Sequence, residues 1–182
     1  MEAFDELRGR LILTGDYRLM LDTVHMLLMP RWFFVAIKKQ VEALAGPEIA
    51  RKVYYEAGYE GATLWAQTQI KEASLRGRAV MDQYLRSGSL RGWGRFEIVG
   101  FEIAKGTGVF RLYNSAIAEE KGSSKGLVCD HMPGSLAGAF QTILDHEGKN
   151  LKVVGRETRC LSKGDPWCEF VVEPFQAESH AI

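Results

Sequence analysis

Apolar residues in the first half of the chain recur at the spacing of amphipathic helices. Proline and glycine mark the boundaries: Pro30 ends the first helix, and Gly46-Pro47 separates two longer ones, because proline is tolerated at the first helical position. Residues 1–18 carry little pattern and are expected to form an N-terminal arm or an early strand at residues 11–13. The predicted helices cover residues 19–28, 32–44, 48–72 and 78–85.

The pattern changes to alternation after residue 88, and Gly106-Thr107-Gly108 is a hairpin signal. The predicted elements are strands over residues 92–105, 109–114, 151–158 and 167–172, and a helix over 133–144. This order predicts an α+β fold in which N-terminal helices pack on a mainly antiparallel sheet. We expect a single domain over residues 19–174 and a flexible tail over 175–182.

Glycines inside the predicted helices indicate close packing. Gly58 and Gly61 interrupt the long helix predicted over residues 48–72. Each glycine costs about 1 kcal/mol relative to alanine there. Small residues also line one side of the later helix, at Gly134, Ala137 and Gly138. We therefore expect other elements to cross these helices at short distance.

Composition narrows the function classes. Lys+Arg and Asp+Glu both number 23, and this balance argues against a nucleic-acid-binding surface. The longest apolar stretch, residues 26–37, is interrupted by Pro30 and Arg31, so no membrane span is expected. An odd cysteine count without a signal-peptide pattern favours the reducing cytoplasm.

The three cysteines and one nearby acid suggest a metal site. Cys129, Glu157, Cys160 and Cys168 offer three thiolates and a carboxylate, which fill a tetrahedral shell with no open position. Such a shell around Zn²⁺ carries a net charge of −2, which neighbouring donors must offset. Four basic residues are close in the sequence: Arg156, Arg159, Lys163 and His131. The alternative is three buried thiols that act as small hydrophobic side chains.

The same segment carries a family resemblance. Glu157-Thr-Arg-Cys160, followed by Leu-Ser-Lys-Gly-Asp-Pro-Trp-Cys168, resembles the C-terminal motif of 4-vinyl reductase domains. This domain also forms the N-terminal sensor of phenol- and xylene-responsive transcription activators. Residues 54–61 and 114–119 are similar to two further family segments, and the resemblance covers about residues 19–173. It implies a fold like that of subunits of the vesicle-tethering TRAPP complex.

In the phenol-sensor branch the matching positions hold a structural zinc. The resemblance therefore implies zinc ligation by Cys129, Glu157, Cys160 and Cys168, in a knuckle near the C-terminus. The segment from Cys129 to Glu157 is longer here than in the sensors, and it carries His131, which is an alternative fourth ligand.

The resemblance also implies a pocket between the sheet and the middle helices for a small apolar or aromatic ligand. The expected lining residues are Trp93, Phe96, Phe110, Leu112, Tyr113 and Phe140. Aromatic residues that alternate on a strand are more often core packing than a binding site. The phenol sensors hold the ligand hydroxyl with a histidine and a tryptophan; here Leu112 takes the tryptophan position, and the strand with Trp93 has no histidine.

Three functions remain open, and no catalytic residues are identified. The first is a stand-alone, homodimeric sensor domain with structural zinc that binds a small ligand and signals through a separate partner. The second is an enzyme accessory or reductase acting on a vinyl or tetrapyrrole substrate, although no phosphate-binding glycine loop for a nucleotide cofactor is present. The third is a dimeric interaction scaffold, with residues 54–65 as its interface.

Overall fold

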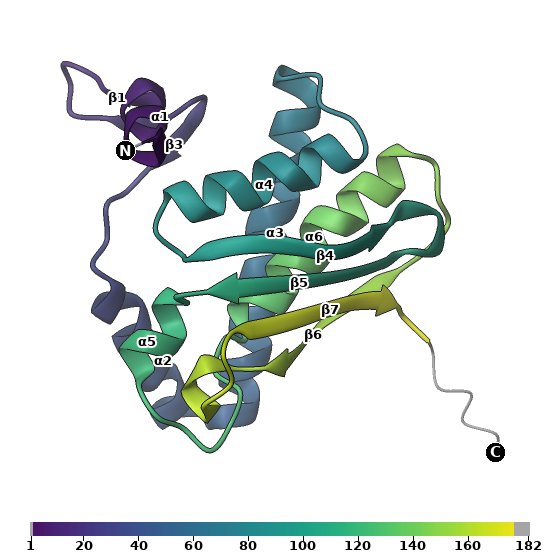
Figure 1. Ribbon diagram of the computed structural model, residues 1–182. Helices are drawn as coiled ribbons and strands as arrows, with labels where there is room; N and C mark the ends of the chain where they lie inside the picture. The colour runs from purple at the N-terminus through teal and green to yellow at the C-terminus, as the bar shows by residue number, and fades with distance from the viewer. Residues whose placement is uncertain (1, 177–182) are drawn as a thin grey trace.

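The computed structural model describes residues 2–176 and shows a two-layer α+β fold (Figure 1). A four-stranded antiparallel sheet in the order β4-β5-β7-β6 is covered on one face by helices. The α+β class with an antiparallel sheet is thus confirmed. Of the expected C-terminal tail, residues 177–182 lie outside the described residues. The strands of this sheet are β4 (Arg95–Glu102), β5 (Thr107–Tyr113), β6 (Val153–Arg159) and β7 (Cys168–Pro174).

The helices follow the predicted pattern closely. Pro47 stands at the first position of α3, and Gly46, with a φ of 86°, ends α2. The helix predicted over residues 78–85 continues to Leu90, past Ser87 and Gly88, because both are buried and pack within it. The pattern did not reveal the short α5, which Ser115 caps. The bounds are α2 (Arg31–Ala45), α3 (Pro47–Glu72), α4 (Arg78–Leu90), α5 (Ala116–Lys121) and α6 (His131–His146).

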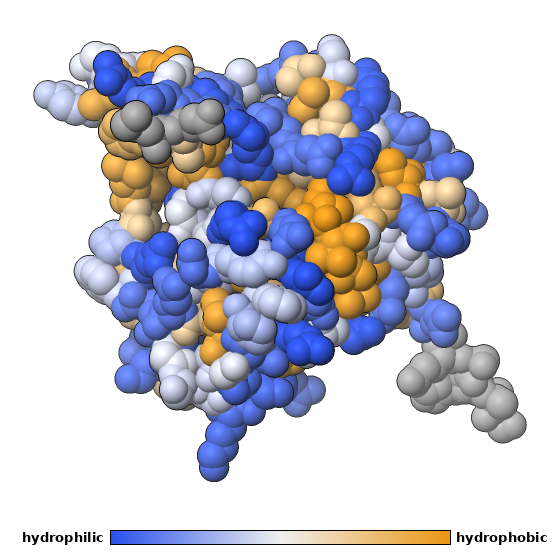
Figure 2. Space-filling view, viewed as in Figure 1, coloured by the Kyte–Doolittle hydropathy of each residue, from blue (hydrophilic) through white to orange (hydrophobic). Residues whose placement is uncertain are grey.

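The N-terminal residues form a small unit of their own, and the helix expected over 19–28 is wrong. Helix α1 (Glu2–Arg10) precedes the antiparallel strands β1 (Leu11–Leu13), β2 (Leu19–Leu21) and β3 (Val24–Met26). Asp22 turns the chain between β2 and β3 with a φ of 55°, which breaks a helix, and Arg10 pairs with its carboxylate. Because β1 pairs with β2, the expected boundary after residue 18 falls inside this sheet. Figure 2 shows apolar surface at this end of the molecule.

Glycines allow α3 and α6 to cross in close contact. A Cβ on Gly134 would lie 2.0 Å from the Tyr55 carbonyl oxygen, and one on Gly138 would lie 2.2 Å from that of Tyr59. Gly58 of α3 is in similarly close contact, since a Cβ added there would lie 2.3 Å from the His131 carbonyl oxygen. The close crossing expected from these three glycines is confirmed. Gly61 differs, because a Cβ there would meet nothing within 4 Å.

The two faces of the large sheet differ in chemistry. The inner face buries Phe110, Leu112 and Phe170 against α6. The outer face is polar, with Arg111 paired to Glu169. The helices therefore cover the inner face only. The site residues are expected on this face and at the end of the sheet where β6 and β7 are joined.

Candidate metal centre and cavity

The structure brings the four expected metal ligands together. One ligand atom from each of Cys129, Glu157, Cys160 and Cys168 lies within 4.8 Å of all the others, and all four residues are buried. The Sγ atom of Cys168 lies 3.7 Å from that of Cys129 and 3.8 Å from that of Cys160. This is the one such buried cluster of three thiols among the described residues.

Three separate segments position these side chains. Cys129 immediately precedes α6, Glu157 lies on β6, and Cys168 begins β7. The register of β6 against β7 shifts between Glu157 and Arg159, so Glu157 and Cys160 can face the same point despite their odd spacing. Gly164, with a φ of 93°, then ends the single turn η2 (Leu161–Lys163) that leads back to Cys168.

The spacing of the sulfurs fits a tetrahedral metal site. Two sulfurs bound at the Zn–S distance of about 2.3 Å are separated by about 3.8 Å when they subtend a tetrahedral angle. The observed separations of 3.7 and 3.8 Å agree with that value. A disulfide would need about 2.0 Å, so the three cysteines are free thiols here.

The pKa values of the cluster give a second indication that it suits a cation. Burial, and then the nearby Cys160 sulfur, raises the pKa of Glu157 to about 9. Hydrogen bonds from Cys129 and Cys168 lower the pKa of Cys160, whereas hydrogen bonding to the other two sulfurs and burial raise the pKa of Cys129 well above its ordinary value. The cluster thus holds one negative charge and no more, because four acids cannot ionise together at this distance. A divalent cation would allow all four to ionise.

One oxygen of Glu157 points to the same conclusion. Its Oε2 accepts a hydrogen bond of 2.9 Å from the backbone N–H of Cys129. Its Oε1 is buried and has no hydrogen-bond partner. A buried carboxylate oxygen without a partner is costly, and a metal ion would satisfy it. The residues present therefore fit a closed three-sulfur, one-oxygen metal site.

Neutral donors surround the cluster. The hydroxyl of Ser115 lies 3.4 Å from the Cys129 sulfur, that of Ser162 lies 3.1 Å from the Cys160 sulfur, and the N–H of Leu161 points to Cys168 at 3.4 Å. The basic neighbours expected from the sequence are engaged elsewhere: Arg156 pairs with Glu173 and Arg159 with Asp165. Hydrogen-bond donors, not cations, would thus offset the charge of the site.

A lysine from a distant helix holds the segment that carries Cys129. Lys38 of α2 is buried and donates to the carbonyl oxygen of Val128 at 2.8 Å and to the carboxylate of Asp130 at 2.6 Å. The two partners flank Cys129 in the chain, so this ammonium group fixes the backbone on both sides of the first ligand. Sequence analysis missed Lys38, because its neighbours on α2 give no sign that one lysine points inward.

His131 does not belong to the cluster. Its ring stacks on Trp93 with centroids 5.5 Å apart and meets the edge of Phe34. Burial lowers the pKa of His131 to about 4, while a hydrogen bond to the backbone of Tyr54 opposes this shift. The alternative of His131 as fourth ligand is therefore not favoured, and the ring belongs to a different site.

That second site is a cavity of about 300 Å³ beneath the first strand of the large sheet. Helices α3, α4 and α6 form its walls, and Val24 of β3 contributes from the N-terminal unit. Aromatic rings dominate the lining, with Trp65, Trp93 and Phe96 as the largest. The cavity opens along α3, where Leu64 retains 59% of its surface exposed.

The expected pocket residues separate into three groups. Trp93 and Phe96 line the cavity. Phe110, Leu112 and Phe140 have no exposed surface and form the core behind it. Tyr113 lies on the outer face of the sheet, where Arg95 stacks over its ring and its hydroxyl donates to Glu97, so the structure places it outside the pocket. Strand alternation alone accounts for this, since adjacent residues point to opposite faces.

Five polar side chains line the cavity together with the rings: Thr68, Tyr84, Arg91, His131 and Ser135. Burial raises the pKa of Tyr84 and lowers that of Arg91, so the tyrosine is neutral at pH 7 while the guanidinium keeps its charge. Sequence analysis found neither. The signal available was their spacing on α4, since Tyr84 and Gly88 share one face with Arg91 just after the helix.

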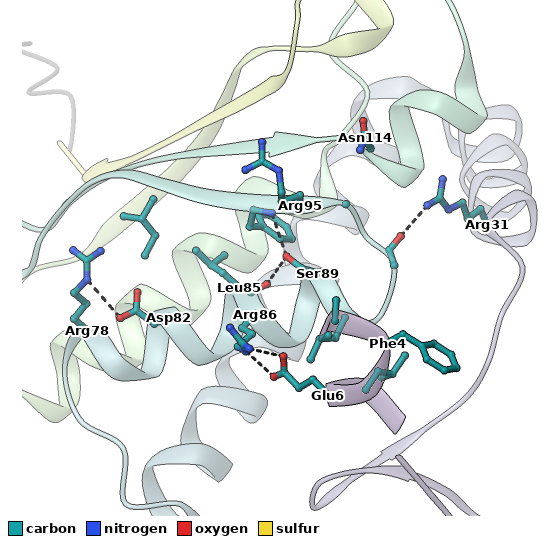
Figure 3. Close-up of a pocket in the computed structure, with 17 residues that line it drawn as sticks. Phe4, Glu6, Arg31, Arg78, Asp82, Leu85, Arg86, Ser89, Arg95 and Asn114 are labelled. Carbon is teal, nitrogen blue, oxygen red and sulfur yellow. Dashed lines mark hydrogen bonds and ion pairs between the residues drawn. The ribbon is translucent and has the colours of Figure 1, made fainter. Parts of the chain in front are cut away.

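A wider groove of about 1250 Å³ runs between α1, α4 and β4 (Figure 3). Three of its arginines are already paired, Arg78 with Asp82, Arg86 with Glu6 and Arg31 with Glu119, and Arg95 stacks over the ring of Tyr113. The groove offers no aromatic enclosure comparable to the cavity, and we assign it no ligand. Within residues 2–176, no helix is long and apolar enough to cross a membrane.

Comparison with family models supports the resemblance. Residues 109–174 match the model of the 4-vinyl reductase domain, and residues 14–99 match a domain of unknown function (DUF5943). The first of these matches contains Cys129, Glu157, Cys160 and Cys168, and it confirms the resemblance to 4-vinyl reductase domains. No curated protein sequence matches the chain.

Solved structures share the fold. The phenol-responsive sensory domain of the transcription activator PoxR, solved with phenol, has a TM-score of 0.78 at 19% identity over 95% of this chain and 89% of its own. A vinyl-4-reductase family protein from Methanocaldococcus jannaschii has a TM-score of 0.55 at 20% identity, covering 85% of both chains. A trafficking protein particle complex subunit 3 from Naegleria fowleri, covalently bound to palmitic acid, has a TM-score of 0.51 at 9% identity, over 80% of this chain and 95% of its own.

Proposed function

We propose that this chain is a small-molecule-binding domain of the sensor type, in which a structural zinc ion stabilises the fold around a ligand cavity. The cavity is the observation that carries the proposal. Its volume of about 300 Å³ lies at the lower end of the range of about 300–1,000 Å³ typical of ligand sites. Such sites are mostly apolar with a few polar groups that orient the ligand, and this lining has that composition.

A solved structure with the same fold adds support. The similar domain of PoxR was solved with phenol, so this architecture accommodates a single aromatic ring in at least one protein. Here Trp65, Trp93 and Phe96 supply flat apolar surfaces for a small apolar or aromatic ligand. Phe110, Leu112 and Phe140 act behind them as packed core.

The metal would stabilise the fold and would not contact the ligand. Cys129, Glu157, Cys160 and Cys168 would hold zinc in a closed shell, which leaves no position for a substrate. Helix α6 begins two residues after Cys129, and four of its residues line the cavity: His131, Met132, Ser135 and Leu136. The metal would therefore fix the end of the helix that forms one cavity wall.

We further propose that the chain is a homodimer that passes its signal to a separate partner. Exposed apolar residues on two helices favour an interface: Trp32, Phe33, Ile37 and Leu44 on α2, and Ile49, Val53 and Leu64 on α3. The expected face over residues 54–65 is divided, because Tyr54, Gly58, Ala62 and Trp65 are buried within one chain. Free thiols in a zinc site suit a reducing compartment such as the cytoplasm.

The exposed helices keep the scaffold function as a second candidate. A dimeric scaffold would use the same apolar surface of α2 and α3 but would not need the cavity. A reductase or tetrapyrrole-binding role has less support, because a macrocycle of four pyrrole rings is far larger than the cavity of about 300 Å³.

The test compares the protein with a variant whose cavity is filled. Ala62 is 2% exposed and lines the cavity, so Ala62→Phe places a ring inside it. Purified protein and variant would each be denatured, and the released small molecules identified by mass spectrometry. The proposal expects a small apolar or aromatic molecule from the first and none from the second, with both folded by circular dichroism. Equal amounts from both would place binding elsewhere and contradict it.

A further inference from the structure

Arg91 is an enclosed cation without an anionic partner. It caps the C-terminal end of α4, and its Nε donates to the carbonyl oxygen of Ser87 at 3.1 Å. No carboxylate pairs with its guanidinium anywhere in residues 2–176. Arginines on the outer face of the sheet behave differently, since Arg111 and Arg156 pair with Glu169 and Glu173.

The surroundings of Arg91 make the lack of an anionic partner costly. Burial lowers its pKa, and the titratable groups that act on it are Tyr84 and His131, neither of which is a carboxylate. Desolvating a charge without a counter-charge is unfavourable, and proteins normally avoid it by pairing the group or leaving it in water. An enclosed, unpaired guanidinium beside a cavity therefore indicates that the compensating anion comes from outside the chain.

The geometry of the lining limits what that anion can be. Arg91 and Trp93 are two residues apart in the turn that leads into β4, and both line the cavity. The ring of Trp93 is held in place by Phe34 and His131, with centroids at 5.3 and 5.5 Å. A fixed ring face beside a guanidinium suits a flat molecule with an acidic group at one end. A guanidinium binds a carboxylate through two parallel hydrogen bonds.

We propose that the cavity binds a small aromatic carboxylate, with its acid group on Arg91 and its ring among Trp65, Trp93 and Phe96. This inference rests on the proposed ligand-binding function and adds the chemical class of the ligand. The cavity volume of about 300 Å³ admits one or two rings with a short acidic substituent. Tyr84 of α4 and Ser135 of α6 also line the cavity and offer hydroxyl groups to the carboxylate oxygens.

The first test uses acid and amide pairs on the unmodified, zinc-loaded chain. Benzoate is compared with benzamide, and phenylacetate with phenylacetamide, by isothermal titration calorimetry at pH 7. Each amide keeps the shape of its acid and removes the charge. A charge-assisted contact to Arg91 predicts that the acid binds about 10-fold to 100-fold more tightly than its amide.

The second test uses a substitution at Arg91. Arg91→Met keeps the length of the side chain and removes its charge, so the acid should bind no better than the amide. The ligand-free melting temperature should stay the same or rise, because an unpaired enclosed charge is lost. Arg51 is exposed on α3, and Arg51→Met is the control that should keep the full preference. Arg91→Lys, which keeps the charge, replaces the methionine variant if that variant does not fold, and should reduce the preference without abolishing it.

The outcomes distinguish a failure of the carboxylate inference from a failure of the proposed ligand-binding function. Amides that bind as tightly as acids would overturn the carboxylate inference while leaving a ligand-binding cavity. A full acid preference in Arg91→Met, or in Arg91→Lys where that variant replaces it, would do the same. If none of the four probes binds to the unmodified chain, the carboxylate inference is overturned; the proposed function then fails as well if the denatured protein releases no small molecule.

Discussion

At the scale of single residues, the account depends on which groups carry charge in the buried cluster. Glu157 decides between a metal site and a packed group of thiols. In a cluster without metal, its raised pKa of about 9 means that it is neutral at pH 7. In a metal site it is ionised and its carboxylate binds the cation. The two cases give opposite expectations for the same substitution.

Glu157→Gln removes the charge while keeping the shape of the side chain. If zinc is bound, we expect loss of the metal or at least about 10-fold weaker binding, together with a lower melting temperature. If the cluster is only core, replacing a neutral buried acid by an amide should change stability little. Thermal unfolding and metal analysis of the same samples distinguish these cases. Glu169→Gln on the neighbouring strand is the control, because that side chain lies on the outer face.

Lys38 supports the same site from outside the cluster. Its side chain is 9% exposed and that of its partner Asp130 is 13% exposed, so removing the ammonium group leaves the Asp130 carboxylate enclosed without its partner. Lys38→Met should lower the free energy of unfolding by about 3 kcal/mol and weaken zinc retention, because the segment before α6 loses its anchor. The adjacent, exposed Lys39 gives the control Lys39→Met. Equal stability of the two variants in urea titrations would contradict this role.

At the scale of elements, the sequence predicted the large helices and the β-strands of the main sheet well. Proline, glycine and apolar spacing determine α2, α3 and α6 locally, so those signals were sufficient. The error over residues 19–28 has a local cause as well. Asp22 adopts a left-handed conformation that no periodicity reveals, and β2 is held by pairing with strands on both sides.

The crossing of α3 and α6 yields a matched pair of substitutions on one helix. Gly58→Ala should destabilise the fold by about 1–3 kcal/mol, because its Cβ would lie 2.3 Å from a backbone oxygen. Gly61→Ala, three residues later, should stabilise it by about 0.5–1 kcal/mol, because alanine favours helix and meets nothing within 4 Å. Chemical denaturation measures both. Effects of the same sign would show that α6 does not approach α3 at Gly58 as described.

The candidate site was predictable only where its signal is local in the sequence. The residue types around Cys160 and Cys168 carry the metal chemistry in a compact motif, and a turn with Gly164 is visible in the sequence. The cavity depends on which faces of α3, α4 and α6 meet, and that is set by packing between distant elements. Trp93 and Phe96 were therefore identified from strand pattern, whereas Arg91 and Tyr84 were found only in the structure.

At the scale of the whole molecule, the exposed helices predict self-association. Phe33 and Ile37 on α2 remain 44% and 42% exposed in the single chain, one helical turn apart. Replacing both by glutamate should convert a dimer into a monomer, because like charges would be brought together in an apolar interface. Light scattering after size-exclusion chromatography measures the mass. Lys39→Glu is the control, and a monomeric unmodified chain would contradict the proposed dimer.

The central claim is a closed structural zinc site beside a ligand cavity, and native mass spectrometry with metal analysis of the same purified sample tests it most directly. The account predicts one zinc ion per chain, retained under mild conditions and lost together with the folded charge-state distribution when a strong chelator is added. A folded chain that carries no metal, and that keeps its charge-state distribution and melting temperature in the chelator, would contradict it.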